Sequence, residues 1–69
     1  MAWARVDERR DGAYDLRAEA PGVSITKAIV FYDRHAALSM AEKIVGYDTE
    51  FELVAGAYGR QAWFGEVAA

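Results

Sequence analysis

The stretch from Val23 to Gly46 constrains the fold more than any other part of the chain. Its first ten residues, Val-Ser-Ile-Thr-Lys-Ala-Ile-Val-Phe-Tyr, are rich in β-branched and aromatic side chains and predict a strand. The following residues predict a helix that begins after Asp33, a good N-cap, and ends at Gly46, where a left-handed backbone costs least. A helix of about three turns is too short to be stable alone in water, so it needs a sheet on which to pack.

The apolar residues of these two segments indicate how they pack. In the helix they form one stripe, with Met40 at its margin and polar residues on the other side; the stripe consists of Ala37, Leu38, Ala41, Ile44 and Val45. The end of the strand is apolar on both faces, which is typical of a central strand that is covered on both sides. One short helix can cover only one of these faces.

Turn signals and alternating apolar residues predict the other strands. Asp11-Gly12 predicts a hairpin turn between strands over 2–10 and 13–20, and Pro21-Gly22 predicts a second turn. After the helix we expect a strand over 49–55, with Phe51 and Leu53 facing the core, a loop over 56–59 and a last strand over 60–68. The fold class is α+β, a small antiparallel sheet in β-β-β-α-β-β order with one amphipathic helix packed on one face. These patterns do not fix how the two halves pair.

Length and composition bound the ways in which such a chain can be stabilised. The 69 residues form one domain over 1–69, and a domain this small is marginal without disulfides, metal ions or oligomerisation. The absence of Cys excludes disulfides and thiolate zinc sites, and a single His excludes a His-rich metal site. We therefore expect no metal or other cofactor, and either a partner or a homodimer.

The compartment follows from what the chain lacks. Its first residues contain no apolar signal segment, and no apolar run approaches the ~20 residues of a membrane span. We expect a cytoplasmic protein that does not contact a membrane.

Two groups of residues are candidates for binding a partner. Asp48, Glu50 and Glu52 recur at period two, which in a strand would place all three carboxylates on one face. Such a row could meet a basic partner, or it could be an ordinary solvated face. One row offers too few converging oxygens for a divalent metal ion.

The aromatic residues Trp3, Trp63 and Tyr58 form the second group. Trp3 shares its face with charged residues, which is not a core pattern, and Trp63 is adjacent to Phe64, so one of these two should lie away from the helix. Exposed aromatic side chains on a sheet face without a helix would mark a partner-binding or dimer surface. The alternative is that the terminal strands curl and bury both tryptophans.

Catalytic and nucleotide-binding motifs are missing. His35 lies in the first helical turn with no arrangement of nucleophile and acid around it, so we expect an ordinary exposed histidine. The glycines form neither a GxGxxG nor a GxxxxGK[ST] motif. We expect that the chain is not an enzyme.

The function that these observations favour is a non-catalytic protein-interaction module. The net charge is −3 and no basic patch is present, so we expect binding to a larger protein or enzyme through the acidic strand, the aromatic face or both. The chain is similar in size and charge to phage- or mobile-element-encoded inhibitors such as anti-CRISPR proteins. It shares no sequence motif with them. The alternative is a nucleic-acid-binding module that stacks bases on its aromatic residues, which the acidic balance disfavours.

Overall fold

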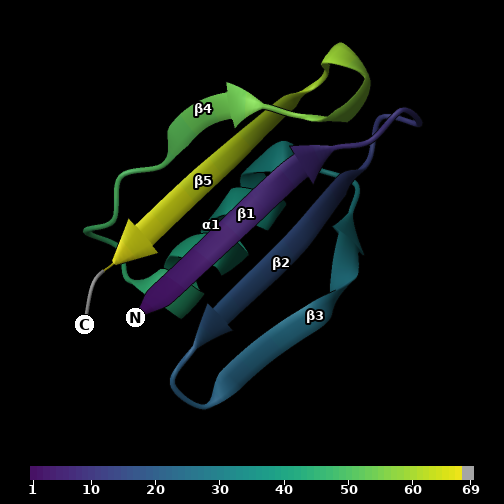
Figure 1. The fold of residues 1–69 in the computed structure, drawn as a ribbon. Coiled ribbons are helices and arrows are strands. Elements are labelled where there is room, and N and C mark those ends of the chain that lie inside the picture. The colour runs from purple at the N-terminus through teal and green to yellow at the C-terminus, as the bar shows by residue number, and fades with distance from the viewer. Residues whose placement is uncertain (68–69) are drawn as a thin grey trace.

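The computed structural model describes residues 1–67, which form a five-stranded antiparallel sheet with one helix on one of its faces (Figure 1). The strand order is β3-β2-β1-β5-β4. The elements are β1 (Ala2–Glu8), β2 (Tyr14–Ala20), β3 (Val23–Phe31), α1 (Arg34–Val45), β4 (Glu52–Ala55), a 3-10 turn (Ala57–Gly59) and β5 (Gln61–Val67). The predicted α+β class and element order are confirmed. Ala68, which the predicted last strand included, lies outside the described residues.

The central strand is β1, and the prediction that the strand before the helix is central was wrong. β1 pairs with β2 on one side and with β5 on the other, so that Val6 lies opposite both Leu16 and Trp63. β3 is an edge strand, and its residues Ile29 and Val30 are 44% and 38% exposed. The helix lies along the middle of the sheet (Figure 1), so it covers β1 and β2 and leaves much of β3 open.

Helix α1 begins and ends where its capping residues predict. The side chain of Asp33 accepts a hydrogen bond from the backbone N–H of Ala36 at 3.0 Å, which satisfies one of the free donors of the first turn. At the other end Gly46 has a φ of 105° and donates its N–H to the carbonyl of Glu42 at 2.7 Å. No helix within residues 1–67 combines the length and the apolar character needed to cross a membrane.

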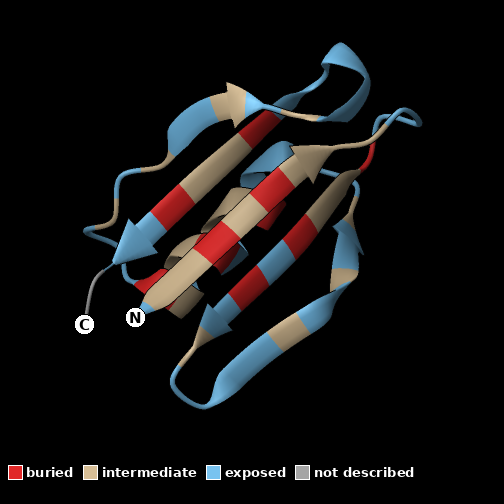
Figure 2. Ribbon diagram, in the orientation of Figure 1, coloured by how far each residue is buried: buried red, intermediate tan, exposed pale blue. Residues whose placement is uncertain are grey.

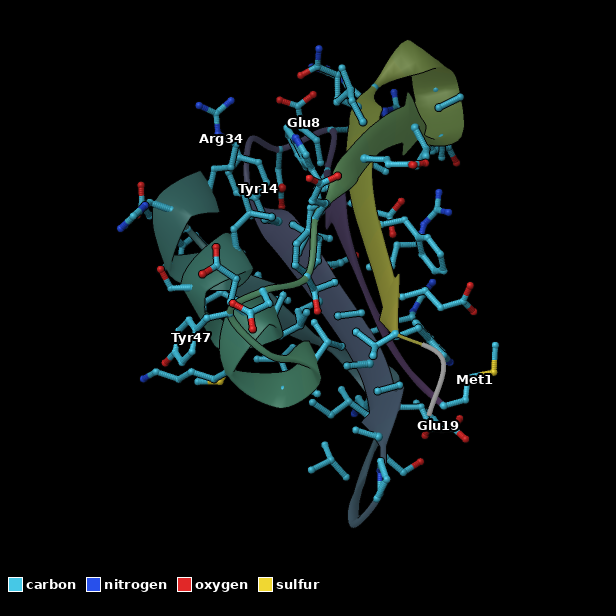
Figure 3. The ribbon with its side chains drawn as sticks, turned by 90° about the vertical axis from the view of Figure 1, so that its left-hand side faces the viewer. Met1, Glu8, Tyr14, Glu19, Arg34 and Tyr47 are labelled. Carbon is cyan, nitrogen blue, oxygen red and sulfur yellow. The ribbon has the colours of Figure 1, made fainter. Side chains whose placement is uncertain are left out.

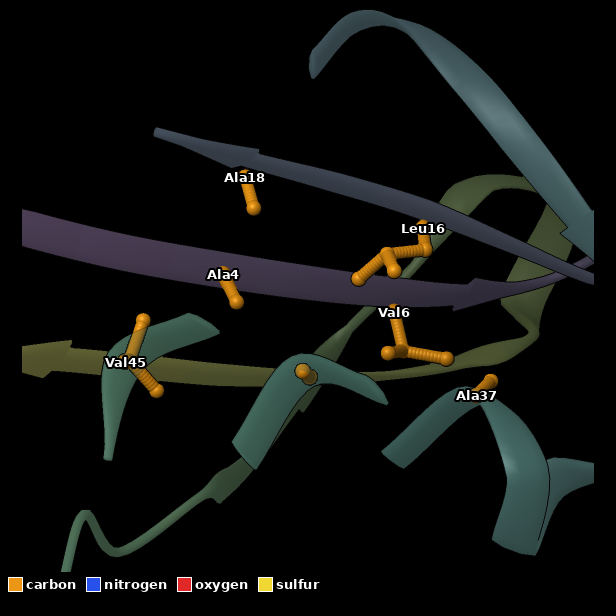
Figure 4. Packing of buried hydrophobic residues seen from close by; sticks show 7 residues of the cluster. Ala4, Val6, Leu16, Ala18, Ala37 and Val45 are labelled. Atoms are coloured by element: carbon orange, nitrogen blue, oxygen red, sulfur yellow. The ribbon is translucent and has the colours of Figure 1, made fainter. Parts of the chain in front are cut away.

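The core between helix and sheet is thin. Its largest fully buried side chains are Val6 and Leu16, and most of the remaining core residues are alanines (Figure 4). Ala37 and Ala41 have no exposed surface, and these small side chains let the helix lie close to β1 and β2. Figure 2 shows the consequence, since buried positions are concentrated in β1, β2, β5 and α1, whereas β3 and β4 are exposed or half-buried.

A glycine in β5 makes room for the side chain that closes this core near β4. A Cβ atom on Gly65 would lie 2.9 Å from Cε2 of Phe51, so the aromatic ring rests directly on the glycine backbone. Phe51 therefore packs against the core as expected. Leu53 was expected to do the same but is 59% exposed, because α1 does not extend over β4.

The thin core makes Leu16 a sensitive position. We expect Leu16→Ala to lower the free energy of unfolding by about 2–5 kcal/mol, because it leaves a cavity in place of one of the two largest fully buried side chains. The same change at the 59% exposed Leu53 should alter it by less than about 0.5 kcal/mol. Urea denaturation followed by circular dichroism measures both values, and equal losses would contradict the assigned core.

Candidate functional site

The candidate site is the sheet face opposite α1, which we call the open face because no described element covers it. Val6 and Leu16 point towards the helix, so the residues that alternate with them point away. Figure 3 shows the helix on one side of the sheet and Glu19 on the other. The cross-strand register places these side chains on the open face: Trp3, Arg5, Asp7, Asp15, Arg17, Glu19, Glu52, Val54, Ala62, Phe64 and Glu66.

An aromatic pair lies on the open face towards the end at which β1 begins. The rings of Trp3 and Phe64 stack with their centroids 6.4 Å apart and an angle of 26° between their planes. Of the adjacent residues Trp63 and Phe64, it is therefore Phe64 that lies away from the helix. Both rings of the pair are half-buried, in part against each other. Offset stacking of this kind stabilises an aromatic pair by about 0.5–1.5 kcal/mol beyond the burial of its surface.

Three carboxylates surround this pair. Glu19 of β2 and Glu66 of β5 both lie directly opposite Trp3, and Glu52 of β4 lies directly opposite Phe64. All three glutamates are exposed, and none forms an ion pair with another described residue. We call these five residues the aromatic–acidic patch. Phe64, Glu19 and Glu66 were not among the predicted site residues, because their proximity to Trp3 depends on which strands pair.

Trp63 lies on the helix side of the sheet, away from Trp3. Its ring packs against Tyr14, with centroids 6.3 Å apart, and the guanidinium of Arg34 lies 5.6 Å from its centroid. Figure 3 shows Tyr14 and Arg34 on this side of the sheet. Trp63 therefore packs the helix onto the sheet, and the structure does not bring it together with Trp3 or Tyr58.

The predicted acidic row does not form, because β4 begins only at Glu52. Asp48 lies in the turn after α1 and Glu50 in the segment before β4. The backbone N–H of Thr49 donates to the carbonyl of Gly46 at 3.2 Å, and its hydroxyl donates to the carbonyl of Val45 at 3.0 Å. These bonds keep the chain coiled at the end of the helix, so period two in the sequence does not place the three carboxylates on one strand face.

A hollow of about 690 Å³ occupies the other end of the open face, between the β1–β2 hairpin and the 3-10 turn. On its floor Arg5 donates from Nε to both carboxylate oxygens of Asp7 at 3.0 Å, and from Nη2 to the carbonyl of Ala55 at 3.3 Å. Arg5 therefore ties β1 to β4 across β5. The residues that line the hollow are Arg5, Asp7, Glu8, Arg9, Arg10, Asp11, Asp15, Arg17, Ala57 and Tyr58.

The hairpin at the rim of the hollow is held by a small ion-pair network. Arg9 bonds to Asp11 and Asp15, each at 3.2 Å. The backbone N–H of Ala13 donates to Asp11 at 3.0 Å, and this bond, together with the charge of Arg9, holds the pKa of Asp11 below its usual value. The arginines and carboxylates of the lining are equal in number, so the hollow has no net formal charge.

Tyr58 projects beside the hollow from a strained backbone. Its φ and ψ are 57° and 31°, and it is the only residue other than glycine within 1–67 that has a positive φ. Its side chain is 78% exposed, and the guanidinium of Arg10 lies 4.9 Å from its ring centroid. A bulky residue is rarely found in this conformation, which costs about 1–2 kcal/mol for a residue with a Cβ atom.

This strain predicts that glycine is more stable than alanine at position 58, the reverse of the usual order. We expect Tyr58→Gly to be more stable than Tyr58→Ala by about 1 kcal/mol, because only glycine is relaxed at a positive φ. At Tyr47, which is 71% exposed and has no positive φ, alanine should be the more stable of the two. Thermal unfolding of the four variants measures both differences. The same order at both positions would contradict the strained conformation.

The chemistry that the open face offers is that of its aromatic and charged side chains. Within residues 1–67 no group of three or more His, Cys, Asp or Glu side chains could hold a metal ion, and His35 is exposed in the first turn of α1. Comparisons with protein-family models, with curated proteins and with solved structures found no match to this chain.

Proposed function

We propose that this chain is a non-catalytic protein-binding module that docks on a larger protein through its open face. The observation that carries the proposal is the stacked pair of Trp3 and Phe64 on a sheet face that no described element covers. Tryptophan and arginine are enriched among the residues that contribute most to protein–protein binding, and Arg5 lies directly beside this pair, opposite Phe64.

The charges around the pair support a protein partner over a nucleic acid. Nucleic-acid surfaces combine aromatic rings with basic residues that neutralise phosphates. Here the ring of Trp3 lies between two carboxylates, and a third lies opposite Phe64. Phosphates would be repelled from the position at which a base would have to stack.

Burial supports binding rather than catalysis. Every buried side chain within residues 1–67 is apolar. A general acid or base commonly acquires a suitable pKa by burial or by a neighbouring charge in a cleft, and no described carboxylate or histidine is buried in this way. The titratable groups of the open face are at the surface, where they are suited to contact a partner.

The partner that we propose is a larger enzyme in the cytoplasm, which this chain would inhibit by occupying part of its surface. The proposal of an inhibitor depends on the small size of the chain and its net charge of −3. Phage-encoded inhibitors such as anti-CRISPR proteins are often small and acidic in the same way. An aromatic centre with an acidic rim is complementary to a basic site, such as one that normally binds a polyanion. The same open face would close on itself in a homodimer if no partner exists.

The proposal is tested by removing the ring of Trp3. We expect Trp3→Thr, which keeps a strand-forming residue, to weaken binding to the captured and purified partner by more than about tenfold. Tyr47→Ala, which removes a 71% exposed ring elsewhere, should leave affinity unchanged. Binding is measured by calorimetry, and circular dichroism checks that both variants fold. Equal affinity of the two variants would contradict docking through this face.

A nucleic acid is tested in a separate titration. Trp63→Phe leaves Trp3 as the one tryptophan, so its fluorescence reports on the open face alone. We expect no quenching by single-stranded oligothymidylate at low salt. Saturable quenching would support base stacking on Trp3 and contradict the protein-binding proposal.

A further inference from the structure

We infer that the open face takes a basic segment of its protein partner, with one arginine or lysine side chain lying on the ring of Trp3 between Glu19 and Glu66. This inference depends on the proposed function, since it specifies the chemistry of the partner. The occupant is thus a cationic side chain of a protein, and neither an apolar segment nor a phosphate group.

The register of the sheet places the three groups in one row. Glu66, Trp3 and Glu19 are direct cross-strand neighbours on β5, β1 and β2. Directly opposed residues have Cβ atoms about 4.5–5.5 Å apart, so both carboxylates are within reach of a cation above the indole. A cation within about 6 Å of a tryptophan centroid is attracted by the ring, and a guanidinium can bond a carboxylate at the same time.

Two other aromatic residues of the described chain, Trp63 and Tyr58, each pair with a guanidinium. Arg34 lies 5.6 Å from the ring centroid of Trp63, and Arg10 lies 4.9 Å from that of Tyr58. Within residues 1–67 the ring of Trp3 has no such partner, although it is the ring with carboxylates on both sides. The row of Glu66, Trp3 and Glu19 could therefore bind a cation, and no described residue supplies one.

The charge balance of the face is complementary to a basic segment. Arg5 is bonded to Asp7, and Arg9 is bonded to Asp11 and Asp15. Arg17 of β2 forms no ion pair with a described residue. The three carboxylates of the aromatic–acidic patch form none either, so they outnumber this one free positive charge. The patch is therefore negative, as is the chain with its net charge of −3.

The direct test titrates hexa-arginine amide into the Trp63→Phe chain and follows the fluorescence of Trp3. We expect saturable quenching, and a Kd that rises about fivefold when Glu19→Gln and Glu66→Gln are combined, since two exposed ion pairs to the peptide are then lost. The control combines Glu8→Gln, at the opposite end of β1 from Trp3, with Glu42→Gln in α1; it changes the net charge equally but leaves the row intact, and should keep the original Kd. Absence of quenching, or equal weakening in both double variants, would overturn the inference.

The purified partner separates the failure of this inference from the failure of the proposed function. If Trp3→Thr abolishes partner binding while the Glu19→Gln, Glu66→Gln variant binds normally, the open face is the docking site. The inference that a cationic side chain lies on Trp3 is then contradicted. If neither variant weakens binding, both proposals fail. Loss of affinity in both variants, with the Glu8→Gln, Glu42→Gln control unaffected, is the result that we expect.

Discussion

The fold depends on the close contact between one helix and the two middle strands. Ala37 and Ala41 of α1 have no exposed surface against β1 and β2, so a helix of twelve residues is enough to bury Val6 and Leu16. The same contact limits what the helix can do, because it covers the middle of one sheet face only. The half-exposed β3 and β4 and the uncovered open face are direct consequences of this geometry.

Local signals were sufficient to predict the elements, whereas the sheet order was not predictable from them. Asp33 and Gly46 act within one turn of their own positions, and the Asp11-Gly12 turn closes a hairpin between neighbours in sequence, so the residues themselves specify these features. The pairing of β1 with β5 joins the two ends of the chain, and no short-range pattern encodes it. The apolar end of β3 was therefore mistaken for that of a central strand, although it lies at an edge.

The candidate site was predictable to the extent that it depends on alternation within one strand. Trp3 was predicted to lie away from the core because it shares its strand face with charged residues, and the residues of the opposite face, Ala4 and Val6, are indeed buried. The choice between Trp63 and Phe64 required the register in which Val6 lies opposite Trp63. Asp48 and Glu50 were misplaced because alternation in sequence has meaning only where the backbone is extended, and this segment is coiled at the helix end.

The β3 edge of the sheet is less suited to binding than the open face. In β3 the register shifts between Leu16 and Ala18 of β2, beside Lys27, and bulges and lysines at an edge disfavour the addition of another strand. On the open face, by contrast, like charges lie directly opposite each other, Arg5 opposite Arg17 and Asp7 opposite Asp15, and the ion pairs of Arg5 with Asp7 and of Arg9 with Asp15 offset only part of this repulsion. Tyr58 adds backbone strain at the same face. A small domain with a thin core has little stability to offset such features, and they are understandable if this face is shaped for a partner rather than for folding alone.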